Sequence, residues 1–290
     1  MTAIAVTRRI SRRKLFGVNA PTIAACYLGL ILLVSLLAPL IAPYGLNQPD
    51  YNAFNDGASQ AHLLGTDQLG RDVLSRLMFG GQVSYEAMAV AVGVAAVVGI
   101  PVGVLAGYLG GWAEDVIMRI ADALLAFPTL LLAIAVSAAL GTGTARVMVG
   151  VGIVLSPSFI RMARIQTRVI ASRLYVDAAR SFGKSPLWTV RWHIAPNGFQ
   201  PLYPLTAHMF GVVLIVEASL SFLGLGAPPP SASWGSMLKD ASQYTPGLTI
   251  QTIAPGLAIA TVLLAINIIG DSMRDNLDPR LTRRLDRASA

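Results

Sequence analysis

Long segments without charged residues decide what this chain can fold into. Pro21 to Ala42 carries no charge, and a helix needs about 20 apolar residues to cross a bilayer. Five further apolar segments follow, at about 83–109, 117–140, 147–160, 202–225 and 248–269. Only 13% of all residues are charged, against about 25% in soluble domains. The sequence therefore predicts an all-α polytopic membrane protein with six transmembrane helices.

Two of these segments depart from a simple apolar span. The segment at 147–160 is short and contains Pro157. We expect it to start earlier, near 141–144, and to continue past Arg161, whose side chain can reach the membrane interface. The segment at 117–140 contains Asp122 and Pro128. We expect each of the two to cross the membrane once.

Glycines recur at every fourth position near the end of the second predicted span, at Gly99, Gly103, Gly107 and Gly111. Small residues at this spacing form a groove on one helix face, which permits close packing of helices in lipid. Pro101 is expected to kink the same helix. The pattern leaves open whether the groove faces a helix of this chain or of a partner.

The distribution of basic residues predicts the orientation in the membrane. A net charge of +7 could suggest nucleic acid as a partner. With six spans and an inside N-terminus, however, only Arg71, Arg76, Arg146 and Lys239 lie outside, and the other 18 of the 22 basic residues lie inside. This asymmetry follows the positive-inside rule, so both termini are predicted to be cytoplasmic.

These assignments divide the chain into successive regions. A cytoplasmic tail (1–20) precedes the first span (21–43), an external loop (44–82) follows, and a core of five spans covers 83–272 before a cytoplasmic tail at 273–290. A second external loop is expected at about 226–247. Within the first loop, residues 65–80 read as a turn followed by a helix capped near Thr66 or Asp67.

The most basic stretch lies between the fourth and fifth spans and reads as two short helices with a bend. Gly183 is placed to end the first helix in a left-handed conformation. Ser185 can cap the second helix, with Pro186 at its first position. We expect this helix to stop before Pro196, because the residue before a proline avoids the helical region. Leu187, Val190 and Ile194 are expected to share one apolar face.

Other motifs point to no chemistry in this chain. Gly-Lys-Ser at 183–185 is similar to the end of a phosphate-binding loop, but that loop needs a glycine where Ala178 stands and a preceding strand. The single cysteine, Cys26, and three widely separated histidines give neither a disulfide framework nor a metal-ligand pattern. The sequence therefore predicts no nucleotide or metal site.

Asp177 to Pro196 resembles the EAA loop of permease subunits of bacterial binding-protein-dependent ABC importers. Ala178, Ala179, Gly183 and Pro196 match that loop, whereas Asp177 stands where Glu is usual and Ala195 where Leu is usual. Further stretches are similar to the C-type subunit of dipeptide/oligopeptide permeases: HLLGTDQLGRDVLSRLMFG (62–80), DALLAFPTLLLAI (122–134), EASLSFLGLGAPPPSASWG (217–235) and GDSMRDNLDPRL (270–281).

The resemblance implies the type I fold of ABC importer permeases in the inner (plasma) membrane of a bacterium. It also implies that the EAA loop, at about 166–200, docks on a cytoplasmic ATP-binding subunit. The residues implied in that coupling are Asp177, Ala178, Ala179, Arg180, Gly183, Pro186, Trp188 and Pro196. The implied partners are a second homologous permease, one or two ATP-binding subunits and an extracytoplasmic peptide-binding protein. ATP and magnesium then belong to the partners, and this chain is no enzyme and holds no cofactor.

Four ionisable residues in or near the spans are candidates for the transport pathway: Glu86, Asp122, His208 and Glu217. Such residues in a membrane protein are functional candidates by default. The carboxylates lie near predicted span ends, where structural pairing is the favoured explanation, and His208 is expected to be packed and hydrogen-bonded. A pathway role would consist of contact with the amino terminus of a peptide.

The predicted function is ATP-driven uptake of di- or oligopeptides. Within the same machine, nickel chelates, glutathione or opines are alternative cargoes, because the binding protein selects the substrate. An ion-coupled secondary transporter would more often show two related halves, and an intramembrane enzyme would need a paired nucleophile and base or metal ligands. The sequence displays neither pattern.

Overall fold

The computed structural model describes residues 20–141, 143–244, 247 and 249–277. The predicted tails at 1–20 and 273–290 fall mostly outside these residues. The regular elements in the described part are all helices, which confirms the all-α prediction. Their bounds are α1 (Ala20–Leu36), α2 (Ala38–Ile41), α3 (Val73–Leu109), α4 (Gly111–Leu125), α5 (Thr129–Leu140), α6 (Thr144–Ala171), α7 (Leu174–Ser181), α8 (Pro186–Thr189), η1 (Val190–Ile194, a π-helical turn), α9 (Ala195–Gly198), α10 (Leu202–Phe222), α11 (Trp234–Tyr244) and α12 (Ile250–Asn276).

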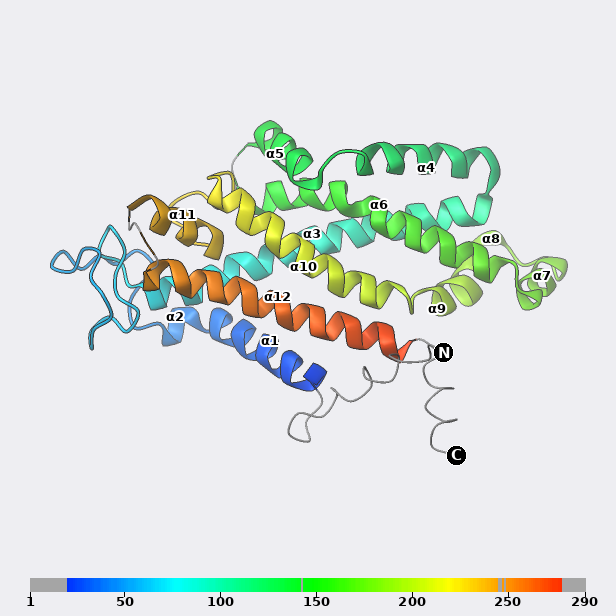
Figure 1. Ribbon diagram of the computed structural model, residues 1–290. Helices are drawn as coiled ribbons and strands as arrows, with labels where there is room; N and C mark the ends of the chain where they lie inside the picture. Colours follow the sequence, from blue (N-terminus) through cyan, green and yellow to red (C-terminus); the bar gives the residue numbers. More distant parts are fainter. Residues whose placement is uncertain (1–19, 142, 245–246, 248, 278–290) are drawn as a thin grey trace, which may run out of the picture.

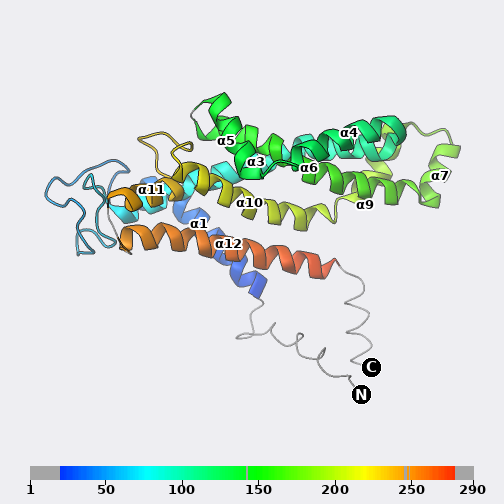
Figure 2. The same ribbon diagram turned by 45° about the horizontal axis from the view of Figure 1, so that its top comes forward.

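The long helices run lengthwise in one bundle (Figures 1 and 2). Within the described residues, α3, α6, α10 and α12 are each long and apolar enough to cross a membrane, and α4 with α5 forms one further, bent candidate. The shorter apolar helix α1 leads directly into α2. This arrangement is compatible with the six predicted spans.

The two ends of the bundle differ. The segment from α7 to α9 lies at one end, and α12 runs toward that end (Figure 1). The 42–72 loop, which joins α2 to α3, and helix α11 lie at the opposite end (Figures 1 and 2). Two isolated antiparallel bridges, Pro49 to Arg71 and Thr66 to Asp72, hold that loop together.

Helix α3 is longer than the second predicted span. It begins at Val73 rather than near residue 83, continues through Pro101 and contains 37 residues, about 55 Å at 1.5 Å per residue. Since the hydrocarbon core is about 30 Å thick, α3 projects beyond it. The expected cap at Thr66 or Asp67 is wrong: Asp72 caps α3, and its carboxylate accepts from the backbone N–H of Ser75 at 2.7 Å.

The third predicted span is not one continuous helix. Helices α4 and α5 are separated at residues 126–128 and bent by 92°. Pro128 disfavours a helical conformation of the preceding residue, and it then stands at the N-cap of α5 with φ −55° and ψ 125°. The fourth predicted span takes its longer form, because α6 runs from Thr144 to Ala171 through both Pro157 and Arg161.

The glycine ladder of α3 packs against α6 of the same chain, which answers the question that the sequence left open. A Cβ atom added at Gly103 would lie 2.4 Å from the backbone oxygen of Ile160, and one at Gly107 would lie 2.6 Å from that of Arg164. Gly99 approaches α6 equally closely. Gly111 is not part of this contact, since it starts α4 with φ +55° and open space around it.

Candidate functional site

The segment from α7 to α9 contains the bend that the sequence predicts. Helix α7 ends at Ser181, and Gly183 follows with φ +73°. Gly183 donates its backbone N–H to the carbonyl of Arg180 at 2.9 Å, and Lys184 donates to Ala179 at 3.1 Å. These two bonds form a Schellman cap, in which the glycine takes the left-handed position.

The second helix of the segment starts as predicted but ends later. The hydroxyl of Ser185 accepts from the N–H of Trp188 at 3.2 Å, with Pro186 at the first helical position. The expected stop before Pro196 is wrong, because α8, η1 and α9 form one helical path to Gly198. A proline ring crowds the carbonyl four residues back. The wider π turn, in which Ala195 donates to Val190, accommodates it.

One side of this segment is anchored to the bundle. Val176 and Ile194 are buried and pack with Ile170 at the end of α6, and Tyr108 near the end of α3 packs against them. The Arg180 guanidinium lies 5.2 Å from the centre of the Tyr108 ring. Because of these packing contacts, a displacement of α7 or η1 would also move the ends of α3 and α6.

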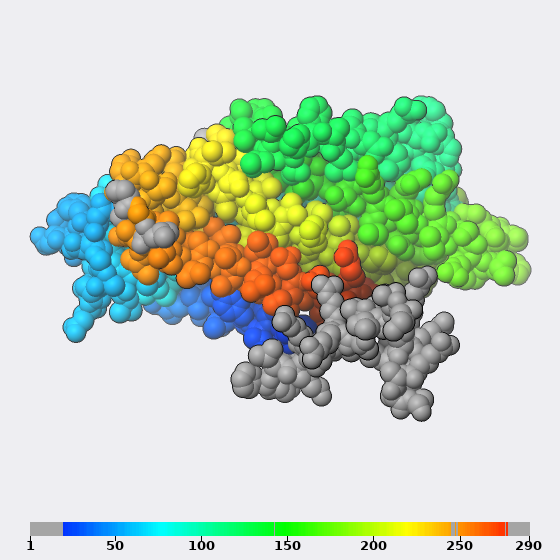
Figure 3. All heavy atoms as spheres, viewed as in Figure 1, coloured from blue at the N-terminus to red at the C-terminus, as the bar shows by residue number. Residues whose placement is uncertain are grey.

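The other side of the segment exposes large apolar side chains. Leu174, Phe182 and Leu187 are 86%, 82% and 78% exposed, and Figure 3 shows the segment as a protrusion at the right-hand end of the molecule. The predicted common face of Leu187 with Val190 and Ile194 is wrong, since only the latter two pack inward. Exposed apolar groups gathered on a protrusion are typical of interaction surfaces.

Basic and aromatic groups surround these apolar side chains. The Lys184 ammonium lies 4.9 Å from the centre of the Trp188 ring, and Arg191 lies 5.8 Å from that of Trp192. Asp177 and Ala178 are exposed on α7, whereas Ala179 is buried, and both Pro186 and Pro196 are exposed. The predicted coupling residues thus divide between an anchoring side and a free side.

The candidate pathway residues lie in separate environments. Asp122 on α4 forms an ion pair with Arg161 on α6 at 2.6 Å. Glu86 is exposed on α3. His208 is also exposed, so the expectation of a packed histidine is wrong. No hydrogen bond or ion pair joins any two of the four predicted residues in the part of the chain that the structure describes.

Glu217 is the most buried of the four, with 1% exposed. Its two carboxylate oxygens accept from the hydroxyl of Ser221 at 2.7 Å and from that of Ser84 on α3 at 3.2 Å. The carboxylate therefore ties α10 to α3.

Glu114 was not among the candidates, yet it is the buried acid of the α4–α6 contact. Its carboxylate forms ion pairs with Arg164 and, at 3.0 Å, with Arg168. Glu114 and Asp122 are eight residues apart and so share one face of α4. The arginines of α6 recur at spacings of three and four, which is the signal that could have paired the two helices.

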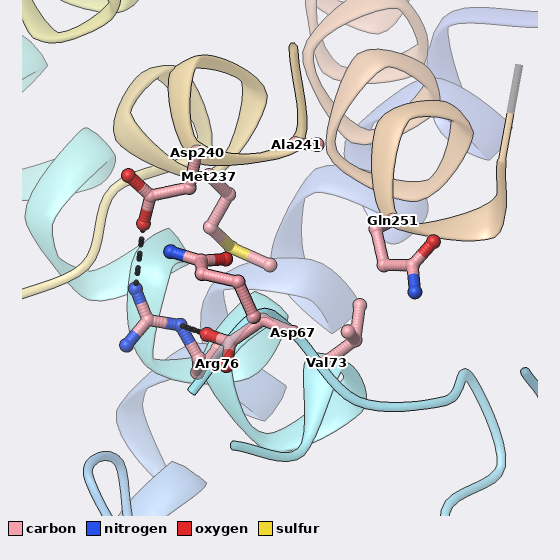
Figure 4. Close-up of a pocket in the computed structure, with 8 residues that line it drawn as sticks. Asp67, Val73, Arg76, Met237, Asp240, Ala241 and Gln251 are labelled. Carbon is pink, nitrogen blue, oxygen red and sulfur yellow. Dashed lines mark ion pairs between the residues drawn. The ribbon is translucent and has the colours of Figure 1, made fainter. Parts of the chain in front are cut away.

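A second cluster that the sequence analysis missed lies where α11 approaches the start of α3 (Figure 4). Asp67 and Asp240 face the buried Arg76, at 3.4 Å and 3.7 Å. Arg71 pairs with the same two acids. Among the described residues, Nη1 of Arg76 has no hydrogen-bond partner, and the adjoining cavity of about 20 Å³ has room for one water. The cluster fastens the 42–72 loop and α11 to the start of α3.

Residues 99–283 match the family model of the binding-protein-dependent transport system inner membrane component. The chain belongs to this family. As a member, it is a permease subunit of an ABC importer and not the catalytic subunit. It is thus a multi-pass inner-membrane protein that works with ATP-binding subunits and a binding protein.

Relatives of known name agree with this family. The chain is 42% identical to the glutathione transport system permease protein GsiD of Escherichia coli O6:K15:H31 over 259 residues, which are 89% of this chain and 86% of that protein. It is 41% identical to GsiD of Pectobacterium atrosepticum over 93% of this chain and 90% of that protein.

A solved structure shows the same fold at low identity. The MetNI methionine ABC transporter in an inward-facing conformation contains a chain that superposes with a TM-score of 0.57 and 16% sequence identity. The superposition covers 70% of this chain and 95% of the other. It supports the predicted ABC importer permease fold.

Proposed function

We propose that this chain passes short peptides across the membrane and that its α7–α9 segment is the EAA loop that couples it to a cytoplasmic ATP-binding subunit. Relatives that align with nearly the whole chain are named for glutathione transport, and glutathione is itself a tripeptide. This name favours glutathione, the alternative cargo, as the first peptide to test.

The main support for the coupling role is that one side of the α7–α9 segment packs against the helix bundle while the other side is exposed. Its anchored side joins the ends of α3 and α6 through Val176 and Ile194. Its free side presents Leu174, Phe182 and Leu187, all more than three-quarters exposed. A partner that binds the free side and then changes conformation can thus displace the transmembrane helices.

In this mechanism the ATP-binding subunits bind ATP and magnesium and perform the hydrolysis. Their closure pushes the segment, tilts α6 and α10 and shifts the pathway between inward-open and outward-open states. Contacts on the segment must differ between these states, since only a difference in interaction free energy can shift an equilibrium. A second permease completes the pathway, and both termini lie on the cytoplasmic side with the segment.

Substitution of Gly183 tests the coupling. Gly183→Val places a branched side chain at φ +73°, which disfavours the bend by about 1–2 kcal/mol although the site is open. Gly111→Val is the matched control, because Gly111 has φ +55°, open space and a place at the turn between α3 and α4. We expect only Gly183→Val to abolish ATP-driven uptake while the complex stays in the membrane. Wild-type uptake by that variant rules out the coupling role.

The cargo requires a separate experiment. Uptake of labelled glutathione in proteoliposomes is measured with unlabelled dipeptides, oligopeptides, a nickel chelate or an opine as competitors. If only peptides compete with glutathione, the result supports the proposal. If only the nickel chelate or the opine competes, that compound and not a peptide is the cargo. Uptake that persists without ATP at a constant ion gradient would instead indicate a secondary transporter.

A further inference from the structure

A stack of four side chains spans the bend of the α7–α9 segment. The imidazole of His193 on η1 contacts two aromatic rings, with ring centres 5.5 Å from Tyr175 on α7 and 5.2 Å from Trp188 on α8. These separations and the tilted or edge-on ring planes are typical of favourable aromatic pairs. The ammonium of Lys184, at the bend itself, lies 4.9 Å from the centre of the Trp188 ring. The stack therefore links both helices and the turn between them.

The bend that the stack spans is built on a glycine with open space around it. A Cβ atom at Gly183 would meet no atom of the described residues within 4 Å, and glycine adopts either sign of φ with similar ease. The two hydrogen bonds of the Schellman cap end at Lys184 and do not reach α8. The angle between α7 and the helical path from α8 to α9 thus depends on contacts between side chains.

Two neighbouring pairs of residues hold α7 beside η1. Val176 and Ile194 belong to the buried cluster that anchors the segment on α6. Tyr175 and His193, each one position earlier, form the outer pair, in which Tyr175 is 44% exposed. The buried cluster alone fixes where α7 lies, but α7 could still rotate about it. A second contact beside the first also fixes the orientation of α7.

The π turn determines which residue contacts Trp188. On a regular α-helix, residues four apart are neighbours and residues five apart are not, so Trp188 would face Trp192. The structure instead pairs Trp188 with His193, five positions later. Among the described residues no ring contact joins the two tryptophans, and Trp192 is 58% exposed. The wider turn of η1, in which Ala195 donates to Val190, thus accompanies the inclusion of His193 in the stack.

We propose that His193 is a positioning residue that makes the α7–α9 segment move as one rigid unit. This inference rests on the proposed function, in which an ATP-binding subunit pushes the segment. The buried cluster and the contact of Arg180 with Tyr108 pass a movement of α7 to α6 and α3, and α9 leads on to α10. Without the His193 contacts the segment pivots at Gly183, and the push changes the bend in place of moving the transmembrane helices.

The first test uses the complete complex in proteoliposomes and measures how much labelled glutathione is taken up per ATP hydrolysed. His193→Ala removes both ring contacts. We expect it to lower this ratio about fivefold, the change in an equilibrium that the loss of two aromatic contacts produces. His193→Phe keeps a planar ring and should restore the ratio to within about twofold of the wild type. A variant that only reduces the amount of folded complex lowers uptake and hydrolysis together and leaves the ratio unchanged.

Trp192→Ala is the matched control. It removes a larger ring from the same turn of η1, but from outside the stack, and we expect the ratio to change by less than about twofold.

A second measurement does not depend on the cargo. Hydrogen exchange of the backbone amides of residues 174–198 in the same complex reports local opening of the segment. We expect about fivefold faster exchange for His193→Ala. His193→Phe and Trp192→Ala should each stay within about twofold of the wild type.

Each outcome decides the inference. A lower ratio and faster exchange for His193→Ala, both restored by His193→Phe, support it. An unchanged ratio for His193→Ala overturns it even if exchange accelerates, because the ring then serves only the stability of the segment. Equal losses for His193→Phe or for Trp192→Ala also overturn it, since the ring contacts of His193 are then not the cause. If the wild-type complex takes up no glutathione, the proposed cargo is wrong, and the exchange rates alone decide the inference.

Discussion

Replacement of Gly103 by alanine tests the contact between α3 and α6 most directly. The added Cβ would lie 2.4 Å from the backbone oxygen of Ile160 and 2.8 Å from the Cβ of Ala163. Ordinary contacts of this kind begin near 3.4 Å, so the helices must separate by about 1 Å. A backbone carbonyl cannot rotate away as a flexible side chain can.

The expected loss follows from two opposing terms. Overpacking of a tight contact costs about 1–3 kcal/mol, and the overlap with a backbone atom places Gly103→Ala near the upper end. Alanine favours a helix over glycine by about 1 kcal/mol. The net change in the free energy of unfolding is thus a loss of about 2 kcal/mol.

Gly93→Ala on the same helix is the matched control. A Cβ there meets nothing within 4 Å, so only the gain of about 1 kcal/mol in helix propensity remains. The two variants differ by about 3 kcal/mol, which corresponds to roughly 6–12 °C in the melting temperature. Thermal unfolding of the full-length chain, purified in detergent, measures this difference. If Gly103→Ala melts no lower than Gly93→Ala, the close contact between α3 and α6 is refuted.

Two buried acids give further predictions with the same unfolding assay. Glu114→Ala removes the acceptor of two α6 arginines that are themselves partly exposed, and we expect a loss of about 2 kcal/mol. Asp115→Ala, on the exposed side of α4, should change stability by less than about 0.5 kcal/mol; equal effects would mean that the ion pairs contribute nothing. Glu217→Leu leaves its serine donors without an acceptor and should cost about 2–3 kcal/mol. Glu217→Gln, which keeps one acceptor, should cost clearly less, and the opposite order would contradict the hydrogen-bonded role.

Local features of the α7–α9 segment could be predicted from the sequence. The left-handed Gly183 and the Ser185 cap depend on residues within one turn of each other, so the local sequence specifies them. The stop at Pro196 could not be predicted correctly, because a π turn relieved the crowding that normally ends a helix. The exposure of Leu187 also depends on how the segment packs against α3 and α6.

The candidate acids show where prediction from sequence ends. Glu217 was a candidate because a charge within an apolar run is conspicuous. Its hydrogen bonding to another helix could not be predicted, because its partner Ser84 lies 133 positions away in the sequence. Glu114 and Arg76 lie in segments that contain several other charges, so the sequence does not single them out as functional candidates. Both are nevertheless buried in the folded chain. Burial is a property of the assembled helices.

Residue composition and order are enough to establish that the chain is helical and membrane-bound, where its apolar segments lie and where its basic residues gather. These properties depend on transfer from water to lipid and on rules that act within a few residues. The packing of the folded chain was needed to establish that the glycine ladder faces α6, that α4 and α5 bend by 92°, and that Asp50 and His62 meet in one cavity. Such features arise when segments far apart in the chain pack together, and hydropathy carries no information about which segments meet.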